Sequence, residues 1–338
     1  MMADDGLPFD GAMAESAPLG GAESAFTSLA EAFAARGHRV EVYNRCKKPL
    51  FYKGVSWAPL EAPIPKSCDL FIGNRGSPVM GLVARAGRRL FWLHNPASYL
   101  KKPRNLLSLL RYRPIVVVTG AYHKESVPPW LPRAGLAVIP YGVRASFRSS
   151  LPRPTPPPIA IFTSNPLRGL DWLLDLWLRR IRPELSSAEL HIYAGAAVYG
   201  SSTKKGAAME AVLARAEGLC GAGVRRLAPL PCESLSKALL GARAMLYRGD
   251  KGETFCLSLA EAQAMGVPAV VTPLGAVPER VIDGETGAVA ADEEAFAASA
   301  IAALGDDLLW QRWHKASLER QKGLSWDEAA RRFEAFLP

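Results

Sequence analysis

The sequence predicts an α/β protein with two doubly wound, Rossmann-like domains. Short apolar runs alternate along the chain with amphipathic helical stretches, which is the pattern of a parallel sheet covered by helices. A segment with five prolines, SSLPRPTPPP at 149–158, interrupts that alternation as a stiff, extended linker. Because the alternation restarts after it, we expect one domain on each side and a ligand at the carboxyl ends of the strands, in the cleft between the domains.

The first domain is expected over residues 1–148. Its clearest helix is AESAFTSLAEAFAAR at 22–36, where apolar side chains follow helical spacing and Gly37 ends the pattern. A shorter helix is expected at 78–86. The apolar runs that predict strands are HRVEVYN (38–44), CDLFIG (68–73), RRLFWLH (88–94), PIVVVTG (114–120) and LAVIPYG (136–142).

The second domain is expected over residues 159–324. The amphipathic segment SWDEAARRFEAFL at 325–337 predicts a final helix, which we expect to return to the first domain over 325–338. Helices of the second domain are expected at 169–181, 206–218, 234–242 and 255–265. Its strands are predicted by IAIFTS (159–164), ELHIYAG (189–195), VRRLAPL (224–230), RAMLYR (243–248) and AVVT (269–272).

Charge and cysteine content narrow the functional classes. The 338 residues carry a net charge of +9, and residues 1–150 hold 20 Lys and Arg against 10 Asp and Glu. Such a one-sided excess indicates an anionic partner; an anionic membrane surface fits, whereas no nucleic-acid recognition motif is present. Simple solubility is the alternative explanation. Without a membrane-spanning run, a signal peptide or paired cysteines, the sequence favours the cytoplasm.

Two glutamates, Glu253 and Glu261, frame the segment ETFCLSLAE. A strand and the turn GDKG precede it, so Glu253 is expected in a loop and Glu261 inside the following helix. The unpaired amides and the dipole of the helix start form an anion site. Because carboxylates repel phosphate, we expect the two glutamates to hold hydroxyl groups on either side of it, as a nucleoside diphosphate sugar would require. Two exposed helix charges are the alternative.

The stretch resembles the E-x7-E motif of retaining family 4 glycosyltransferases, which have the GT-B fold. The similarity continues through EAQAMGVPAVVTPLGAVPERVIDGETGAV (261–289) and extends to SNPLRGLDWLL (164–174), PLGGAESAFTSLAEAFAARGHRVEVY (18–43), VIPYGV (138–143) and FWLHNP (91–96). It implies two Rossmann-like domains that face each other across a cleft, with the C-terminal helix returning to the N-terminal domain. The family normally begins with an apolar strand, whereas residues 1–17 contain none that is convincing. The first strand is therefore expected to be missing, or to be poorly replaced by 7–14.

The resemblance also implies roles for residues of the second domain. Glu253 would hold hydroxyls of the donor sugar, and Glu261 those of the ribose. Arg168 takes the position of a lysine that neutralises the diphosphate, while Thr163 stands where the family often has a second cation, so that the clamp is weaker or is rebuilt from Lys251. The remaining donor-binding residues implied here are Ser164, Asn165, Leu230 (through its backbone to the base), Thr254, Phe255, Cys256 and Leu257.

Three further residues are implied on the N-terminal side. Gly20 and Gly21 would let the backbone approach the phosphate. His94 would lie beside the transferred sugar, which makes His94, Arg168 and Glu253 the expected catalytic residues. The thiol of Cys256 is interpreted as packing rather than as a nucleophile, because apolar residues flank it.

The function implied by the resemblance is a retaining, hexosyltransferase-like enzyme. It would move a sugar from a UDP- or GDP-sugar to a glycan or lipid-linked acceptor, in polysaccharide or lipopolysaccharide synthesis, at or near the inner membrane face. No D-x-D motif is present, so no metal is expected, and no cofactor is expected besides the nucleotide-sugar substrate. Two alternatives remain open: a sugar-nucleotide epimerase of the same fold, and a non-catalytic nucleotide-sugar-binding subunit.

Overall fold

The computed structural model describes residues 1–148, 151–199 and 204–338, which divide into two compact units. Unit 1 contains residues 1–16, 21–142 and 324–338, and unit 2 contains residues 17–20 and 143–323. Two residues of the predicted linker, Ser149 and Ser150, lie outside the described residues.

The division at Gly142 and Val143 differs from the predicted linker at 149–158. The chain beyond Val143 is already anchored in unit 2, since Phe147 is fully buried there and Arg153 Nη1 donates a hydrogen bond to the carbonyl of Met265. Prolines made the segment a plausible linker, but these buried contacts attach it to the second unit.

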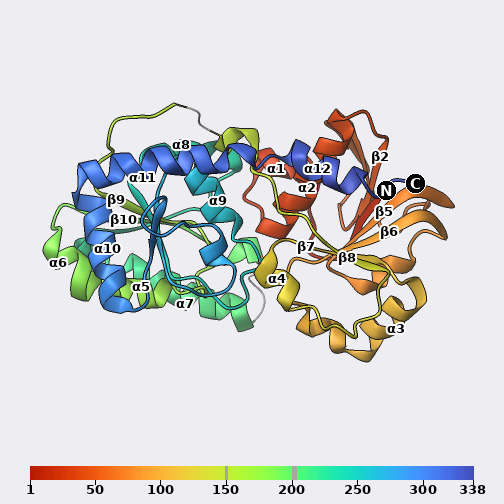
Figure 1. The fold of residues 1–338 in the computed structure, drawn as a ribbon, viewed down its shortest axis with the longest axis horizontal. Coiled ribbons are helices and arrows are strands. Elements are labelled where there is room, and N and C mark those ends of the chain that lie inside the picture. Colours follow the sequence, from red (N-terminus) through yellow and green to blue (C-terminus); the bar gives the residue numbers. More distant parts are fainter. Residues whose placement is uncertain (149–150, 200–203) are drawn as a thin grey trace. The chain divides into compact units, whose positions relative to one another are not determined.

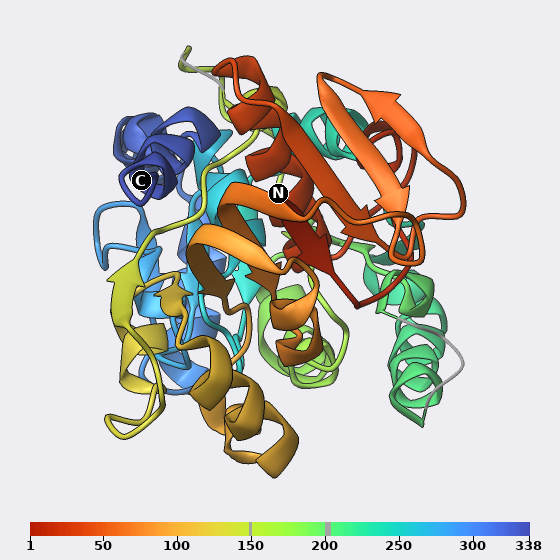
Figure 2. The ribbon, with the colours of Figure 1, turned by 90° about the vertical axis from the view of Figure 1, so that its right-hand side faces the viewer.

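Unit 1 is built on an eight-stranded sheet in the order β3-β4-β2-β1-β5-β6-β7-β8 within the described residues (Figures 1 and 2). All its strand pairs are parallel except β3 with β4. Its strands are β1 (Met2–Asp4), β2 (Val40–Asn44), β3 (Leu50–Tyr52), β4 (Val55–Pro59), β5 (Ser67–Asn74), β6 (Arg85–Trp92), β7 (Ile115–Val118) and β8 (Gly135–Val138). Its helices are α1 (Met13–Ser16), α2 (Gly21–Ala35), α3 (Pro103–Tyr112), α4 (Ala121–Glu125) and α12 (Trp326–Glu334), with 3-10 turns η1 (Ser77–Gly81) and η2 (Ala97–Lys101).

Strand β1 corrects the expectation that the first strand is missing. Its three residues are all buried, and it pairs in parallel with β2 on one side and with β5 on the other. Three residues are too few to show an alternation of apolar and polar side chains, and a strand that is buried on both faces has no such alternation. A search for periodicity therefore misses β1.

The helix predicted at 78–86 is also wrong. A single 3-10 turn, η1, occupies Ser77–Gly81, and β6 already begins at Arg85. The parallel register pairs Ser67 with Arg85, which leaves too short a crossover for an α-helix.

The C-terminal helix belongs to unit 1, as the fold prediction expects. α12 packs against α2, where the rings of Phe33 and Phe333 lie 6.3 Å apart. Arg36 at the end of α2 pairs with Glu334 at 2.6 Å and with Asp327 at 2.7 Å. Apolar and charged contacts therefore hold α12 on α2.

Unit 2 is built on a six-stranded sheet in the order β11-β10-β9-β12-β13-β14, with every pair parallel within the described residues. Figure 1 shows helices on both sides of this sheet. Its strands are β9 (Ile159–Phe162), β10 (Glu189–Tyr193), β11 (Val224–Leu227), β12 (Ala244–Tyr247), β13 (Ala269–Val271) and β14 (Gly287–Val289). Its α-helices are α5 (Leu170–Leu176), α6 (Arg182–Glu184), α7 (Lys204–Glu217), α8 (Cys232–Leu240), α9 (Leu257–Ala264), α10 (Glu293–Gly305) and α11 (Asp307–Arg320). Shorter turns are the π-turn η4 (Trp177–Ile181) and the 3-10 turns η3 (Ala145–Phe147), η5 (Ala196–Tyr199), η6 (Cys220–Ala222), η7 (Val277–Glu279) and η8 (Gln321–Gly323).

In the described parts of the chain, no helix combines the length and the apolar character needed to cross a membrane.

Candidate functional site

The strand order of unit 2 creates a topological switch point between β9 and β12. β9 is the first strand of the sheet in the chain; β10 pairs with it on one side and β12 on the other. Loops that leave neighbouring parallel strands at such a point open a crevice at the carboxyl ends, where ligands of α/β sheets bind. The two loops here are 163–169 and 248–256, and they carry most of the predicted donor residues.

The loop after β9 is shaped by Asn165 and Gly169. Asn165 Oδ1 accepts the amide of Leu167 at 2.9 Å, and its carbonyl accepts the amide of Arg168 at the same distance. Gly169 has a φ of 90°, and a Cβ there would lie 2.6 Å from the Cβ of Arg248. Only glycine fits this turn without strain, and the turn fixes where the side chain of Arg168 starts.

Glu253 is the centre of a buried polar network. Arg168 Nη1 lies 2.5 Å from Glu253 Oε1, and the hydroxyl of Tyr247 donates to the same oxygen. The hydroxyl of Ser164 donates in turn to Tyr247 at 3.2 Å. Glu253 is 4% exposed, whereas a third of the Arg168 side chain is accessible, so the cation connects the network to solvent.

The structure therefore brings together three of the predicted residues, Ser164, Arg168 and Glu253. It adds Tyr247, which sequence analysis missed because a tyrosine at the end of an apolar strand looks like core. Burial, and next the charge of Glu253, raise the pKa of the Tyr247 hydroxyl well above its usual range. Tyr247 thus stays protonated and serves as a donor to the carboxylate.

The loop that contains Gly275 and Ala276 packs against the backbone of Glu253. The amide of Ala276 donates to the carbonyl of Glu253 at 3.0 Å. Gly275 has a φ of 65°, and a Cβ there would lie 2.4 Å from the carbonyl oxygen of Asp250. The close backbone approach holds the glutamate loop in one place.

The turn between Glu253 and α9 is buried. Thr254, Phe255 and Cys256 are each at most 5% exposed, and Cys256 precedes α9 with a φ of 64°. The helix begins at Leu257, two residues later than predicted, because the turn takes up that length. Burial, with a contribution from Glu253, raises the pKa of the Cys256 thiol far above its usual value, which fits a packing role.

Glu261 lies on α9 itself rather than in the network. It is 9% exposed, and burial raises the pKa of its carboxyl group to about 8, with the charge of Arg144 acting in the opposite direction. Leu230 is half-buried and follows β11 at the same edge of the sheet.

The sequence analysis also missed Arg280, a cation whose side chain is 12% exposed. The guanidinium of Arg280 lies 4.3 Å from the centre of the Phe255 ring, and burial lowers the pKa of Arg280. Arg280 therefore places positive charge beside the turn before α9. The family resemblance implies a second cation at position 163, where this chain has Thr163. A lone arginine after a 3-10 turn gives no sequence signal for this role.

His94 belongs to unit 1, where it follows β6 and lies in a separate buried network. Because Asn74 donates to the carboxylate of Asp4, the side-chain oxygen of Asn74 faces His94 and accepts from Nε2. Nδ1 of His94 then accepts from the hydroxyl of Tyr141. Burial, and next the charge of Arg75, lower the pKa of His94, so the ring is neutral.

The two predicted glycines fall on either side of a unit boundary. Gly21 opens α2 in unit 1, and a Cβ at Gly21 would meet nothing within 4 Å, so packing does not require glycine there. Gly20 ends the segment 17–20 that clusters with unit 2. Their predicted contact with phosphate stays a prediction.

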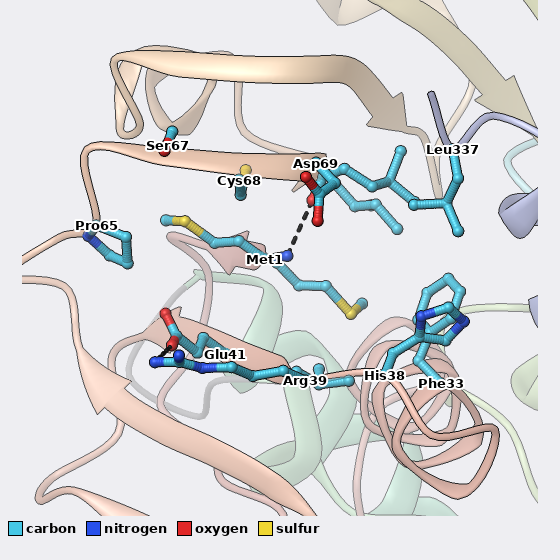
Figure 3. Close-up of a pocket in the computed structure, with 14 residues that line it drawn as sticks. Met1, Phe33, His38, Arg39, Glu41, Pro65, Ser67, Cys68, Asp69 and Leu337 are labelled. Atoms are coloured by element: carbon cyan, nitrogen blue, oxygen red, sulfur yellow. Dashed lines mark hydrogen bonds and ion pairs between the residues drawn. The ribbon is translucent and has the colours of Figure 1, made fainter.

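Unit 1 also contains a cavity of about 320 Å³ at the amino ends of β1, β2 and β5 (Figure 3). Its polar lining includes Arg39, which pairs with Glu41 at 2.6 Å, and Asp69. Because it lies at the opposite edge from the carboxyl ends of the strands, it does not have the position of a Rossmann-type ligand site. Across residues 1–148, 151–199 and 204–338, no three His, Cys, Asp or Glu side chains lie close enough to hold a metal ion.

Comparisons with known proteins show what the chain is similar to in sequence and in fold. Residues 157–306 match the family model described as "Glycosyl transferases group 1". D-inositol 3-phosphate glycosyltransferase of Corynebacterium diphtheriae is 33% identical over 114 residues, which are 33% of this chain and only about a quarter, 26%, of that protein.

Solved structures resemble the chain over nearly its whole length. Sucrose-phosphate synthase from Thermosynechococcus elongatus has a TM-score of 0.75 at 18% identity, covering 99% of this chain and 97% of the other. WaaG, a glycosyltransferase involved in lipopolysaccharide biosynthesis, has a TM-score of 0.70 at 14% identity and covers 99% of both chains. Anabaena HepE in complex with UDP-glucose has a TM-score of 0.72 at 13% identity, covering 99% of this chain and 98% of the other. At these identities the structures show a shared fold.

Proposed function

We propose that the protein is a retaining glycosyltransferase that uses a nucleotide-sugar donor. The chain has the GT-B fold, and the match of residues 157–306 to the family model "Glycosyl transferases group 1" supports the proposal. The observation that carries the proposal is the network centred on Glu253 at the switch point of unit 2. Arg168 and Tyr247 both contact Oε1 of Glu253. Its other oxygen, Oε2, is then available to accept hydroxyl groups of the donor sugar.

Arg168 supplies the positive charge for the diphosphate. Its side chain is one-third exposed, and one of its terminal nitrogens is held by Glu253. A guanidinium can bind phosphate oxygens with two parallel hydrogen bonds. We assign Arg280, beside Phe255, as the second cation that compensates for Thr163. With these cations the leaving diphosphate is stabilised without a metal ion.

The reaction proceeds on one face of the sugar. The bond between the anomeric carbon and the diphosphate oxygen breaks as the acceptor oxygen forms its bond on the same face, and the acceptor proton passes to the departing diphosphate. No protein nucleophile is needed, which fits a buried, protonated Cys256. Electrostatic stabilisation of the leaving group is the largest catalytic contribution expected. His94, being neutral, would act beside the sugar as a hydrogen-bonding group rather than as an acid.

We assign the donor as a UDP- or GDP-linked hexose and the acceptor as a glycan or lipid-linked glycan. HepE, which shares the fold, is known in complex with UDP-glucose, and WaaG acts in lipopolysaccharide biosynthesis. The excess of basic residues in the first half of the chain fits an acceptor at an anionic membrane surface on the cytoplasmic side. Glu261 would hold the ribose hydroxyls, and Leu230 would meet the base.

Donor turnover in site variants tests the proposal. Arg168→Ala and Glu253→Ala should each lower the rate of sugar transfer or donor hydrolysis about 10²–10³-fold, because each removes a charge that acts in the transition state. The matched controls are Arg179→Ala and Glu294→Ala, two exposed residues of unit 2, and both should keep full activity. Wild-type turnover in both site variants would refute the assignment, and loss of activity on chelation would refute its metal-independent part.

Incubating the protein with the donor alone separates the two alternatives, a sugar-nucleotide epimerase and a non-catalytic nucleotide-sugar-binding subunit. NMR of the donor alone would show an epimeric sugar if the protein is a sugar-nucleotide epimerase. Tight nucleotide binding without transfer or hydrolysis would instead indicate a non-catalytic subunit. A thermal-shift screen with UDP, GDP and ADP identifies the nucleotide, since stabilisation grows with ligand concentration over Kd.

A further inference from the structure

The outer face of α3 in unit 1 carries leucines that the fold does not use. Leu109 on the inner side is part of the hydrophobic core, and Asn105 accepts the hydroxyl of Ser77 at 2.6 Å. On the outer side Leu107 is 68% exposed and Leu110 is 58% exposed. α3 lies on the outside of unit 1 in both views (Figures 1 and 2). The helix is thus anchored by one face while its other face offers apolar side chains to solvent.

A tryptophan extends this apolar face. Trp130 is 58% exposed, and together with Leu110 and Arg113 it lines a shallow hollow between the end of α3 and the loop 129–135. Leucine and tryptophan on one surface are the combination that enters the boundary between lipid headgroups and acyl chains. An exposed tryptophan beside Leu110, with Leu107 three residues earlier on the same helix, marks an interaction surface rather than scattered surface residues.

The charge around this face is almost entirely positive. Exposed cations precede and follow the leucines: Lys101, Lys102, Arg104, Arg111 and Arg113. Residues 101–135, which contain α3 and the loop 129–135, hold seven Lys and Arg and a single acidic residue, Glu125. A second copy of the chain would bring the same positive charge to this surface, so self-association is disfavoured. The complementary partner is therefore anionic and has an apolar interior.

We propose that Leu107, Leu110 and Trp130, surrounded by these cations, form a docking surface through which unit 1 binds the anionic leaflet of a lipid bilayer. The helix lies in the plane of the interface, its outer leucines and Trp130 insert below the headgroups, and the cations contact lipid phosphates. The inference extends the proposed function by naming the surface that would bring a lipid-linked acceptor to the enzyme, but the docking itself does not depend on sugar transfer.

Vesicle sedimentation of the full chain tests the surface. Wild-type protein should sediment with vesicles of phosphatidylcholine and phosphatidylglycerol, and much less with phosphatidylcholine alone. Leu107→Gln with Leu110→Gln should weaken partitioning at least about tenfold, since it removes the inserted area. Arg104→Gln with Arg111→Gln should weaken it about 25-fold, at about fivefold per cation. Glutamine suits exposed helix positions, so the variants should fold.

Matched controls are available in unit 2. Leu308 is 79% exposed on α11, and Leu308→Gln should sediment as the wild type does; Arg179→Gln is the control for lost charge. Quenching of tryptophan fluorescence by brominated lipids reports insertion directly. Trp130→Phe should remove most of this quenching. Unchanged partitioning in the double leucine variant would overturn the proposal. So would salt-sensitive binding to RNA or DNA that needs only the arginines, because it would identify a polyanion site.

The two proposals fail separately. Transfer to a soluble acceptor should be unchanged in the leucine variants if the docking surface only binds lipid. Conversely, Glu253→Ala should sediment normally with anionic vesicles while its turnover is lost.

Discussion

At the scale of single residues, Glu261 links stability to pH. Its carboxyl group has a pKa of about 8 in the fold, against an ordinary value of 4.5, because burial disfavours the ionised form. At a pH between these two pKa values, the carboxyl group is protonated in the folded protein and ionised in the unfolded chain. The stability from this neutral carboxyl is fully present below about pH 4.5 and is lost as the pH rises through 8, by roughly 1.4 kcal/mol per pH unit in between.

Glu261→Gln tests this linkage. The variant keeps the size and the neutral polar character of the protonated acid, so it should be about as stable as the wild type near pH 5 and more stable near pH 8. Urea unfolding at a series of pH values measures the difference, with Glu294→Gln as an exposed control that should not alter the slope. If the free energy of unfolding varies with pH in the same way in the wild type and in Glu261→Gln, Glu261 is ionised in the folded protein and the linkage is refuted.

The residues of the site differ in how far the sequence could predict them. Ser164, Arg168 and Glu253 were identified through motifs, and the structure joins them through hydrogen bonds and an ion pair. Tyr247 and Arg280 were not, because neither a buried tyrosine at a strand end nor an isolated arginine departs from the pattern of a core or a surface. Their roles depend on which strands become neighbours, and this information lies in the tertiary fold.

At the scale of elements, the start of α5 depends on one glycine. Gly169 has a positive φ of 90°, and a side chain there would run into Arg248. Gly169→Ala should destabilise the protein by about 1–3 kcal/mol from backbone strain and crowding. Because Arg168 precedes it, nucleotide binding should weaken as well. Gly221→Ala, where a Cβ would meet nothing within 4 Å, is the matched control. Urea unfolding and thermal shift with UDP measure the two effects; an unchanged midpoint would contradict the strain.

Elements with a strong pattern were predicted well, and elements defined by their neighbours were not. The amphipathic helix at 22–36 corresponds to α2, Gly21–Ala35, because its apolar spacing is long and regular. β1 and the antiparallel pair β3 and β4 were missed because three to five residues are too few to show a period. The helix expected at 78–86 failed for the related reason that the register of β6 on β5 leaves no room for it.

At the scale of the whole molecule, the last helix ties the end of the chain to the first unit. Unit 2 ends at Gly323, and α12 then packs on α2 within unit 1. Phe333 is fully buried there, with its ring 5.3 Å from that of Trp92. The sequence predicted this return through the family resemblance, since an amphipathic helix alone does not reveal which sheet it covers.

Phe333→Ala should therefore weaken unit 1 selectively. Removing a buried phenylalanine side chain typically lowers the free energy of unfolding by about 3–5 kcal/mol. If stability is divided between the units, amides of α2 and β6 should exchange hydrogen faster in the variant, while those of β9 and β12 keep their protection. Hydrogen exchange followed by mass spectrometry measures this, with Leu308→Ala as an exposed control in unit 2. Equal acceleration in both units would instead mean that the chain unfolds as one cooperative body. The C-terminal helix would then stabilise the proposed donor site in unit 2 as much as it stabilises unit 1, on which it packs.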